Sequence, residues 1–307
     1  MALAGGIDLG GTKIEATLFD ADWQPIESQR IATPRASYDD MLDALASQTR
    51  WIIEHANQID LPIGIGVPGR IDPETGLSFT ANLPASGHPM RDDLRAAVGR
   101  HIYFGNDCDL FTYSEAVLGA GVPFETVFGL ILGTGIGGGI CHGDTLYQTR
   151  NGASGEVGHL PISAELAREF DLPLITCGCG RPGCYETLGA GPGLKRLAQH
   201  LTGQTAQPID IAAAARAGDT DANRTMHIWS RIIAELIGGL QRTIDPDCVV
   251  LGGGLSNIPG ICDLITAQLP DALLPGTTPP LVTPAKYGDS SGTRGAALAA
   301  LRERQKK

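Results

Sequence analysis

The sequence predicts an α/β protein built from two similar lobes. The chain has 307 residues, enough for two domains of ordinary size, and 42% of them are hydrophobic, as in most globular proteins. A strand, a glycine turn and a second strand occur near the amino terminus, and this pattern returns about 125 positions later. No low-complexity segment or long linker separates the two copies. Such a duplication indicates two lobes with a cleft between them, where small ligands usually bind.

The charge of the chain argues against nucleic acid as a partner. The formal net charge is −11, whereas proteins that contact a phosphate backbone usually present a basic face. No apolar run approaches the roughly 20 residues needed to cross a bilayer. The amino terminus, MALAGGIDLGG, lacks the basic and apolar regions of a signal peptide. We therefore expect a cytoplasmic protein that acts on a small molecule and has no membrane partner.

The first copy of the pattern begins at Gly5. GGIDLG predicts a strand, residues 10–12 a turn, and KIEATLFD a second strand whose apolar residues alternate with polar ones. Ser37 is expected to cap a helix that runs to about Asn57. LPIGIGVPG predicts a buried strand followed by a loop, and HIYFGND predicts a strand that ends at residues 106–107, where a helix begins.

The second copy consists of the strand VFGLILG, the glycine turn TGIGGG and the short strand ICHG. A long amphipathic helix is expected from about Asp219 to Ile244, followed by the strand CVVLGGG. The segment SSGTRGAALAALRERQ predicts a terminal helix.

Three glycine clusters follow apolar strands: DLGGTK, GTGIGGG and the GGG at residues 252–254. Glycine lets backbone N–H groups approach a phosphate without a Cβ in the way. Neither a Rossmann turn nor a Walker A motif fits, because GTGIGG runs into a strand and the order Gly-Lys-Ser/Thr is absent. Any one cluster is compatible with a simple hairpin turn, but three together favour nucleotide phosphates.

Two aspartates lie at strand ends. Asp8 adjoins the first glycine turn, where a carboxylate would face phosphates through a bridging cation, for which Mg²⁺ is the obvious candidate. Asp107 follows Asn106 at the start of a helix, so it is a candidate both for a helix cap and for a catalytic base. The two roles are compatible.

Three of the seven cysteines lie within CGCGRPGC. The spacing is too tight for a useful disulfide framework in a cytoplasmic protein, but it suits thiolates that converge on one metal. Cys177, Cys179 and Cys184 supply three ligands. Tetrahedral Zn²⁺ takes a fourth, and His159 in GEVGH is the nearest upstream candidate. A closed site leaves no position for water, so this zinc would be structural and would hold the surrounding loop.

In order along the chain, DLGGTK, the strand end at residues 106–107, LGTGIGGG, GEVGH, CGCGRPGC and VVLGGGLS resemble the ROK family of sugar kinases and related repressors. This family belongs to the actin/hexokinase-like superfamily, and the resemblance covers nearly the whole chain. It implies a two-lobed, ribonuclease H-like α/β fold with a central cleft and a small zinc-binding loop. We expect a small lobe from residues 1–119 plus 291–307, a larger lobe with the zinc loop from 120–290, and a homodimer.

The resemblance also implies that the γ-phosphoryl group of ATP, with Mg²⁺, is transferred to a sugar hydroxyl, most often O6. Asp107 would accept the proton, and an ordinary carboxylate suffices because a loose phosphoryl-transfer transition state needs proton removal only late. The residues expected to contact the sugar are Gly69, Asn82, Asn106, Asp107, Glu156, His159 and Glu186. Those expected to bind ATP are Asp8, Gly10, Gly11, Thr12, Lys13, Gly133, Thr134, Gly135, Gly253 and Gly254.

The segment TANLPASGHP resembles the sugar-facing loop of bacterial N-acetylglucosamine kinases more than that of fructokinases. Phosphorylation of N-acetyl-D-glucosamine at O6 is therefore the expected reaction, with fructokinase or glucokinase activity as the alternative. A ROK repressor would carry a helix-turn-helix, for which there is no room before Gly5, and a non-catalytic sugar sensor would lack the base. The chain departs from the family pattern at Asp109, in NDCD where NDAN is common, and at Ala190, where serine is common.

Overall fold

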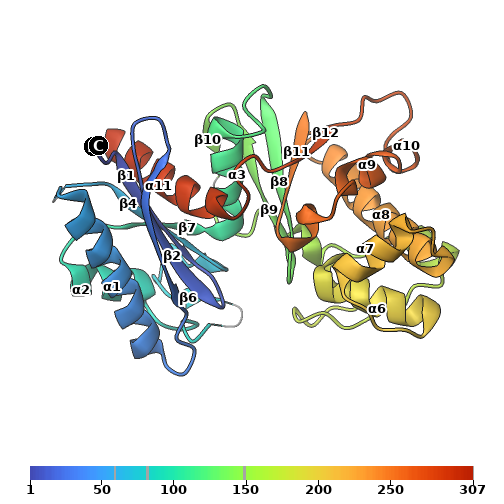
Figure 1. The fold of residues 1–307 in the computed structure, drawn as a ribbon, viewed down its shortest axis with the longest axis horizontal. Coiled ribbons are helices and arrows are strands. Elements are labelled where there is room, and N and C mark those ends of the chain that lie inside the picture. The colour runs from blue at the N-terminus through green and yellow to red at the C-terminus, as the bar shows by residue number, and fades with distance from the viewer. Residues whose placement is uncertain (59, 81–82, 148–149, 307) are drawn as a thin grey trace. The chain divides into compact units, whose positions relative to one another are not determined.

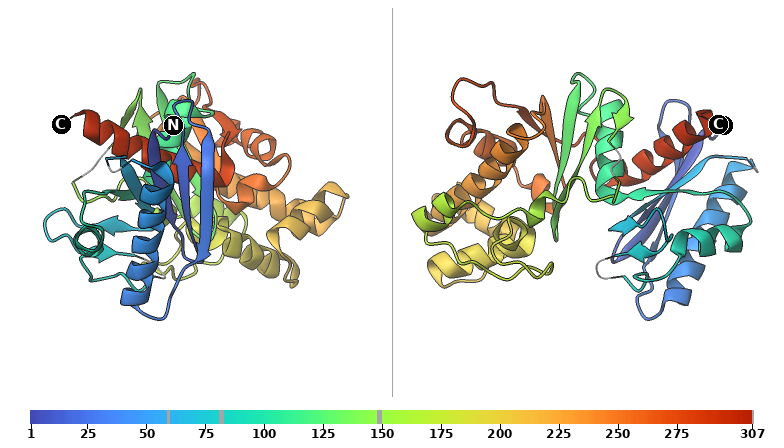
Figure 2. Two further views of the ribbon diagram at one scale, coloured as in Figure 1. Left: turned by 60° about the vertical axis from the view of Figure 1, so that its left-hand side comes forward. Right: turned by 180° about the vertical axis from the view of Figure 1, so that it is seen from behind.

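The computed structural model of the chain describes residues 1–58, 60–80, 83–147 and 150–306 (Figures 1 and 2). The chain divides into two compact units, each described by itself below. The first unit comprises Met1–Val117, Asp144–Ser154 and Asp289–Lys307, and the second comprises Leu118–Gly143 and Gly155–Gly288. This division groups residues 144–154 with the first unit, whereas the lobes expected from the sequence place them in 120–290.

The first unit contains a five-stranded sheet with the order β3-β2-β1-β4-β7. Its strands are β1 (Ala4–Leu9), β2 (Lys13–Phe19), β3 (Pro25–Ala32), β4 (Ile63–Val67) and β7 (Tyr103–Asn106). The first three strands form an antiparallel meander, whereas β1, β4 and β7 run parallel. Parallel strands end at the same edge of a sheet, so the predicted aspartates, at the end of β1 and directly after β7, lie at one edge.

Helices cover both faces of this sheet (Figure 1). A Cβ on Gly5 of β1 would meet Ile52, and a Cβ on the next residue, Gly6, would meet Thr293. Successive side chains of a strand point to opposite faces, so the helices that carry Ile52 and Thr293 lie on opposite faces. The unit comprises α1 (Tyr38–Ala56), α2 (Met90–Val98), α3 (Asp107–Leu118) and α11 (Ser291–Gln305), with the short strands β5 (Arg70–Ile71), β6 (Ser78–Phe79) and β10 (Thr145–Leu146).

The helix α1 begins and ends where the sequence predicts. The Ser37 side chain accepts a hydrogen bond from the backbone N–H of Asp40 at 3.1 Å, and Asn57 ends the helix in the left-handed conformation. Its apolar face is buried, with Met41 and Leu45 fully covered. The predicted helix from Ser37 to about Asn57 is confirmed.

The terminal helix α11 packs so closely on neighbouring elements that backbone lies directly against backbone. A Cβ on Gly6 of β1 would lie 1.8 Å from the carbonyl oxygen of Thr293, and a Cβ on Gly64 of β4 would lie 2.0 Å from that of Ala296. On the helix itself, a Cβ on Gly295 would lie 1.8 Å from a backbone oxygen of α3. Glycine is therefore required on both sides of this contact. The contact joins α11 to β4 and to β1 and α3, which carry the predicted aspartates.

The second unit is built around a sheet in which its strands have the order β9-β8-β11-β12. Its longer strands are β8 (Thr126–Leu132), β9 (Ile136–His142), β11 (Cys248–Gly252) and β12 (Leu281–Pro284). β8 and β9 form an antiparallel hairpin, and β8, β11 and β12 run parallel. Each sheet thus contains an antiparallel hairpin followed by parallel strands, as expected from the repeated pattern.

Helices of the second unit bury a large apolar core around α8 (Thr220–Gln241). Trp229 of α8 is fully buried, and its Nε1–H donates to the carbonyl oxygen of Gly189 at 2.8 Å. The other helices are α4 (Ala164–Glu169), α5 (Glu186–Gly189), α6 (Gly191–Thr202), α7 (Pro208–Arg216), α9 (Ile261–Thr266) and α10 (Leu269–Ala272), with the 3₁₀ turns η1 (Val157–His159), η2 (Gly254–Asn257) and η3 (Gly288–Ser290).

The glycine run after β8 differs from the prediction. The sequence suggested that TGIGGG forms a turn, but β9 already begins at Ile136, so three of these glycines lie inside a strand. A Cβ on Gly138 would lie 2.4 Å from the ring of Phe128 and 2.5 Å from the carbonyl oxygen of Gly129. Gly138 therefore makes room for a buried aromatic ring, and the turn is confined to residues 133–135.

Gly64→Ala is expected to lower the free energy of unfolding by about 3 kcal/mol or more, because the new methyl group would meet backbone rather than a movable side chain. Urea denaturation followed by circular dichroism measures this. Gly239→Ala in α8 is the matched control, since a Cβ there meets nothing within 4 Å and alanine favours a helix over glycine by about 1 kcal/mol. Equal stability of Gly64→Ala and wild type would contradict the backbone contact.

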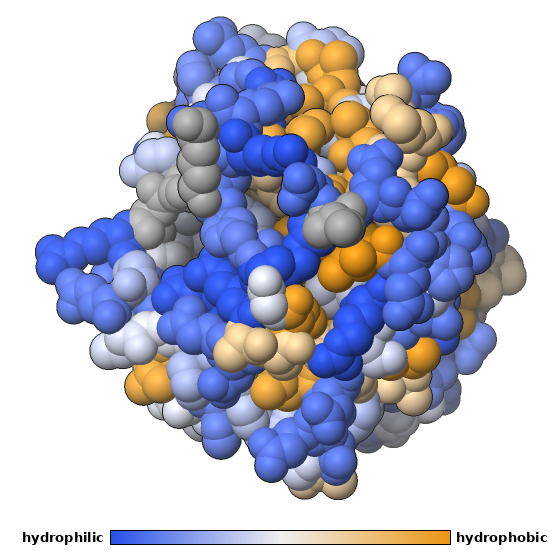
Figure 3. Space-filling model, turned by 90° about the vertical axis from the view of Figure 1, so that its left-hand side faces the viewer, coloured by the Kyte–Doolittle hydropathy of each residue, from blue (hydrophilic) through white to orange (hydrophobic). Residues whose placement is uncertain are grey.

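Hydrophilic residues predominate on the face shown in Figure 3, and hydrophobic residues (orange) form patches between them. Exposed large apolar side chains such as Ile26, Leu174 and Ile209 are each about half exposed or more. Within the described chain, no helix combines the length and the apolar character that a membrane span needs.

Candidate active site

The first unit places two predicted aspartates around one glycine at the carboxyl edge of its parallel strands. Asp8 lies in β1, and Asp107 begins α3 directly after β7. A Cβ on Gly66 of β4 would lie 3.8 Å from Asp8 Oδ1 and 3.8 Å from Asp107 Cα. A Cβ on Gly292 of α11 would lie 3.4 Å from Asp8 Cγ. Gly66 and Gly292, which the sequence did not single out, thus keep side chains away from the Asp8 carboxylate.

Asn106 fixes the start of α3. Its Oδ1 accepts a hydrogen bond from the backbone N–H of Asp109 at 3.0 Å, which is the contact of a helix N-cap. Asp107 Oδ1 accepts from the backbone N–H of Cys108 at 2.9 Å. The capping role that the sequence left open for Asp107 is therefore taken by Asn106, and Asp107 occupies the first helical position.

The loop after β4 is tied to Asn106. The Nδ2–H of Asn106 donates to the carbonyl oxygen of Gly69, in this loop, at 2.8 Å. Gly69 has a φ of 108°, and a Cβ there would lie 2.1 Å from the carbonyl oxygen of Phe79, so only glycine fits. The structure thus brings Gly69, Asn106 and Asp107 together, whereas the predicted sugar contact Asn82 lies outside the described residues.

The first glycine turn is closed at its base and open at its tip. The backbone N–H of Gly10 donates to the carbonyl oxygen of Lys13 at 2.9 Å. Thr33, at the end of the meander, donates its hydroxyl to the Gly10 carbonyl oxygen at 2.7 Å and its backbone N–H to that of Thr12 at 3.1 Å. A Cβ on Gly11 would meet nothing within 4 Å. The turn is held rigidly while its tip has room for a bulky anion.

In the second unit, the two other glycine turns touch each other. The backbone N–H of Gly133 donates to the carbonyl oxygen of Gly135 at 3.0 Å. Gly253 has a φ of 78°, and a Cβ there would lie 3.0 Å from the backbone nitrogen of Gly133. A Cβ on Gly254 would meet nothing within 4 Å. The predicted ATP-binding residues of this unit therefore lie on two adjoining turns, one at residues 133–135, which include Thr134, and one at residues 253–254.

Glu186 connects this glycine surface to the cysteine cluster. Its Oε2 accepts a hydrogen bond from the backbone N–H of Ile136 at 2.9 Å, and a Cβ on Gly135 would lie 2.5 Å from the same oxygen. Its Oε1 lies 3.7 Å from Cys177 Sγ. A side chain at position 135 would push this carboxylate aside, so the glycine leaves room for Glu186 in addition to its predicted phosphate contact.

The four predicted metal ligands form one compact cluster. The ligand atoms of His159, Cys177, Cys179 and Cys184 all lie within 4.8 Å of one another. Cys179 Sγ lies 3.6 Å from Cys184 Sγ, and His159 Nδ1 lies 3.5 Å from Cys177 Sγ. A tetrahedral site with Zn–S near 2.3 Å and Zn–N near 2.0 Å requires separations of about 3.8 and 3.6 Å. The donor set and its spacing therefore fit a Cys₃His zinc site.

The protonation of the cluster is linked to metal binding. Burial raises the pKa of the Cys184 thiol to about 12, and burial also raises the pKa of Cys177. In contrast, a hydrogen bond from the Arg181 backbone lowers the pKa of Cys179. Without a cation the first two thiols keep their protons at neutral pH. Zinc must displace those protons, so its affinity falls as the pH falls.

The two ring nitrogens of His159 have different neighbours. Nδ1 faces Cys177, while Nε2 lies 3.6 Å from Glu156 Oε2. The surrounding loop packs closely against β9. A Cβ on Gly155 of this loop would lie 1.9 Å from the carbonyl oxygen of Gly138 in that strand. One nitrogen can therefore bind a metal while the other stays next to the Glu156 carboxylate.

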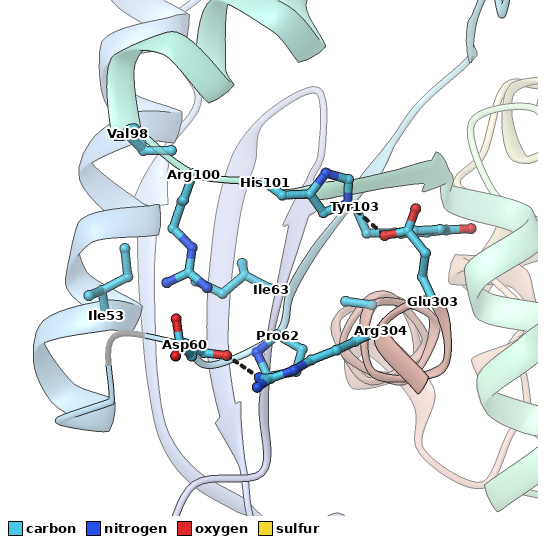
Figure 4. Close-up of a pocket in the computed structure, with 12 residues that line it drawn as sticks. Ile53, Asp60, Pro62, Ile63, Val98, Arg100, His101, Tyr103, Glu303 and Arg304 are labelled. Carbon is cyan, nitrogen blue, oxygen red and sulfur yellow. Dashed lines mark hydrogen bonds and ion pairs between the residues drawn. The ribbon is translucent and has the colours of Figure 1, made fainter. Parts of the chain in front are cut away.

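A cavity of about 720 Å³ lies elsewhere in the first unit, at the amino ends of β4 and β7 (Figure 4). Arg100 and Arg304 line it, and both donate to backbone carbonyl groups of residues 60–61. His101 contacts Glu303 at 2.6 Å. The arginines and His101 are engaged with the protein itself. The volume of this cavity therefore does not identify it as the active site, and the candidate site at Asp8 and Asp107 lies at the opposite strand ends.

The sequence model of the ROK family matches residues 4–303. The N-acetyl-D-glucosamine kinase of Pectobacterium atrosepticum is 39% identical over 298 residues, or 95% of this chain and 97% of that protein. The N-acetyl-D-glucosamine kinase of Escherichia coli K12 is 39% identical over 299 residues, with the same two shares of 95% and 97%.

Solved structures share the fold over nearly the whole chain. A ROK hexokinase from Thermus thermophilus is 32% identical, with a TM-score of 0.86 and 99% of each chain covered. A ROK family glucokinase from Streptomyces griseus, solved in complex with glucose and AMPPNP, is 28% identical, with a TM-score of 0.80 and coverage of 98% of this chain and 99% of that one. The predicted hexokinase-like α/β fold is confirmed, and on sequence and structure alike the chain belongs to the ROK family.

Proposed function

We propose that this protein is an ATP-dependent kinase that transfers the γ-phosphoryl group to O6 of N-acetyl-D-glucosamine. The observation that carries the proposal is the 39% identity, over 95% of the chain, with curated N-acetyl-D-glucosamine kinases. The arrangement of Asp8, Gly66 and Asp107 supports it, because it supplies one carboxylate for a cation and another for a hydroxyl proton at the same strand edge.

In the first unit, Asp107 would accept the proton of the attacking sugar hydroxyl. Its helix start is fixed by Asn106, so the carboxylate is positioned before the sugar binds, and positioning contributes more than basicity in phosphoryl transfer. Asp8 would hold Mg²⁺, directly or through water, in the space left by Gly66 and Gly292. When bound, the cation neutralises charge on the phosphate oxygens. Gly10–Lys13 would contribute backbone N–H groups to the phosphates.

In the second unit, Glu156, His159 and Glu186 would accept and donate hydrogen bonds to sugar hydroxyls. A zinc ion held through His159 Nδ1 would fix the ring so that Nε2 faces the sugar. Its chemistry would be structural, since three thiolates and one imidazole complete a tetrahedron. The backbone surface of Gly133, Gly135, Gly253 and Gly254 would bind ATP.

A kinetic comparison of sugars tests the proposal. We expect kcat/KM for N-acetylglucosamine to exceed that for glucose by about ten- to a hundredfold, because amide-binding groups left unpaired cost about 1–3 kcal/mol each. Fructose should be worse still, because its ring presents different hydroxyl positions. A coupled ADP-release assay with N-acetylglucosamine, N-acetylmannosamine, glucose, mannose and fructose measures all five. A fructose value equal to or above that for N-acetylglucosamine would contradict the assignment.

Glucokinase activity is the second candidate, favoured by the Streptomyces griseus relative solved with glucose. A regulatory function is less well supported. A ROK family transcriptional regulator shares the fold at 20% identity and a TM-score of 0.82, but a non-catalytic sensor has no need of Asp107. We further propose a homodimer, which light scattering would test. A cytoplasmic location agrees with the use of ATP and with three reduced zinc-binding thiols.

A further inference from the structure

A smaller cavity of the first unit, of about 340 Å³, adjoins the candidate sugar contacts. Its wall is formed by edge strand β7, the loop after β4, the start of α2 and residues 146, 150 and 152, and it includes Asn106. The charged residues of the wall are Arg70, Arg91, Asp109 and Arg150. The wall of this cavity therefore carries three guanidinium groups and one carboxylate, although the formal net charge of the whole chain is −11.

The contacts of these arginines occupy a minority of their hydrogen-bond donors. Within the described chain, Arg150 makes no hydrogen bond or ion pair. Arg70 lies 3.5 Å from Asp72, too far for a good hydrogen bond, and its guanidinium stacks 4.4 Å above the Phe79 ring. Arg91 donates its Nε–H to an exposed neighbouring carboxylate at 3.0 Å. Each guanidinium has five N–H donors, so the cavity has ample capacity for an acceptor-rich anion.

The larger cavity in Figure 4 provides a contrast within the same unit. There, Arg100 and Arg304 donate to carbonyl groups of the turn before β4, and Asp60 and Glu303 also line the wall. Cations and carboxylates are balanced in that cavity. Among the residues that line the smaller cavity, arginines outnumber carboxylates three to one, although Asp72 and Asp92 lie against two of these arginines from outside the wall. Selectivity for an anion is therefore expected there rather than in the larger cavity.

We propose that the smaller cavity binds the phosphate group of a phosphorylated sugar. Guanidinium groups recognise phosphate oxygens through paired N–H donors, and phosphate offers several acceptors at once. Because Asn106 belongs both to the cavity wall and to the candidate sugar contacts, an occupant would hinder sugar binding. The 6-phosphate produced by the proposed reaction carries this group, so the product would inhibit its own synthesis. Only this inhibition rests on the proposed function; phosphate binding does not.

Isothermal titration calorimetry tests the binding directly. Inorganic phosphate and N-acetylglucosamine 6-phosphate are titrated separately into the wild type, Arg150→Gln and Arg91→Gln. We expect both ligands to bind the wild type, and each substitution to raise Kd about tenfold, as for loss of a charge-assisted contact. Arg150→Lys should keep part of the affinity, since it keeps the charge but not the fork. Rising NaCl concentration should weaken binding.

A substitution of opposite sign and a distant control complete the design. Asp109→Asn removes the carboxylate of the wall and should lower Kd for both ligands severalfold. Arg224→Gln on α8 makes the same charge change on an exposed surface and should leave Kd unchanged. Binding that is equal in the wild type, Arg150→Gln and Arg91→Gln, or absent from the wild type at millimolar ligand, would overturn the proposal. Binding of inorganic phosphate without the sugar phosphate would overturn the sugar-phosphate assignment.

Initial-rate kinetics tests the consequence for catalysis. N-Acetylglucosamine 6-phosphate should inhibit competitively against the sugar, with an inhibition constant that rises about tenfold in Arg150→Gln. Inhibition of equal strength in Arg150→Gln and the wild type would show that the product acts elsewhere. Calorimetric binding by a protein without kinase activity would refute the proposed function and leave the phosphate site standing, so the two failures are distinguishable.

Discussion

Asp107→Asn is expected to lower kcat by a factor of about 10² or more while the fold and the affinity for the sugar are retained. Asparagine has the size of aspartate and still offers an oxygen to the backbone N–H of Cys108, which Asp107 Oδ1 now accepts at 2.9 Å. It cannot accept the proton of a sugar hydroxyl. The start of α3 should be unaffected, because Asn106 supplies the cap.

Turnover, sugar binding and stability are measured separately for this variant. Steady-state kinetics gives kcat, calorimetry gives the sugar Kd, and thermal unfolding gives the stability. Asp43→Asn is the matched control, since Asp43 is an exposed aspartate of α1 in the same unit. Near wild-type turnover by folded Asp107→Asn would remove this residue from the mechanism.

Cys179→Ser is expected to abolish zinc binding, to destabilise the second unit by several kcal/mol and to weaken sugar binding together. The wild type should contain about one zinc ion per chain, because three cysteines and His159 complete a tetrahedral site. Loss of the metal leaves the buried thiols of Cys177 and Cys184 protonated and releases the ring of His159, whose Nε2 faces Glu156. The effect on the sugar follows because this cluster also touches Glu186.

Elemental analysis, thermal unfolding and sugar titration decide this prediction. Cys262→Ser makes the same chemical change in α9, away from the cluster, and should retain the metal. Apparent zinc affinity of the wild type should fall as the pH is lowered, because the raised pKa values of two thiols make protons strong competitors. A metal-free wild type with full activity would exclude the zinc site and its supporting role.

Local chemistry made parts of the structure predictable. Ser37 and Asn57 bound α1 as expected, since capping depends on a few adjacent residues. The cysteine cluster was also predictable, because its three thiols lie close together in sequence and few donor sets suit zinc. The ends of β7 and the start of α3 followed from the change of pattern at residues 106–107.

Other features depend on segments far apart in the chain and left no local signal. Thr33, which follows β3, donates a hydrogen bond to the first glycine turn, although β2 and β3 separate the two in the sequence. Gly138 is required by the ring of Phe128 on the paired strand, so its place in a strand rather than a turn could not be read from the glycine run. Gly66 and Gly292 frame Asp8 from β4 and α11, and only the fold brings them to it.

Because α11 packs on β1 and β4, the first unit can be completed only after the second unit has been synthesised. Gly6 and Gly64 face a helix that starts at Ser291, which follows the second unit in the sequence. By then, nearly all of the second unit, which ends at Gly288, has already been synthesised. Domains commonly fold as units, the amino-terminal one first during synthesis. Here the first unit must wait for α11, which follows the second unit in the sequence, before the backbone contacts of Gly6 and Gly64 can form.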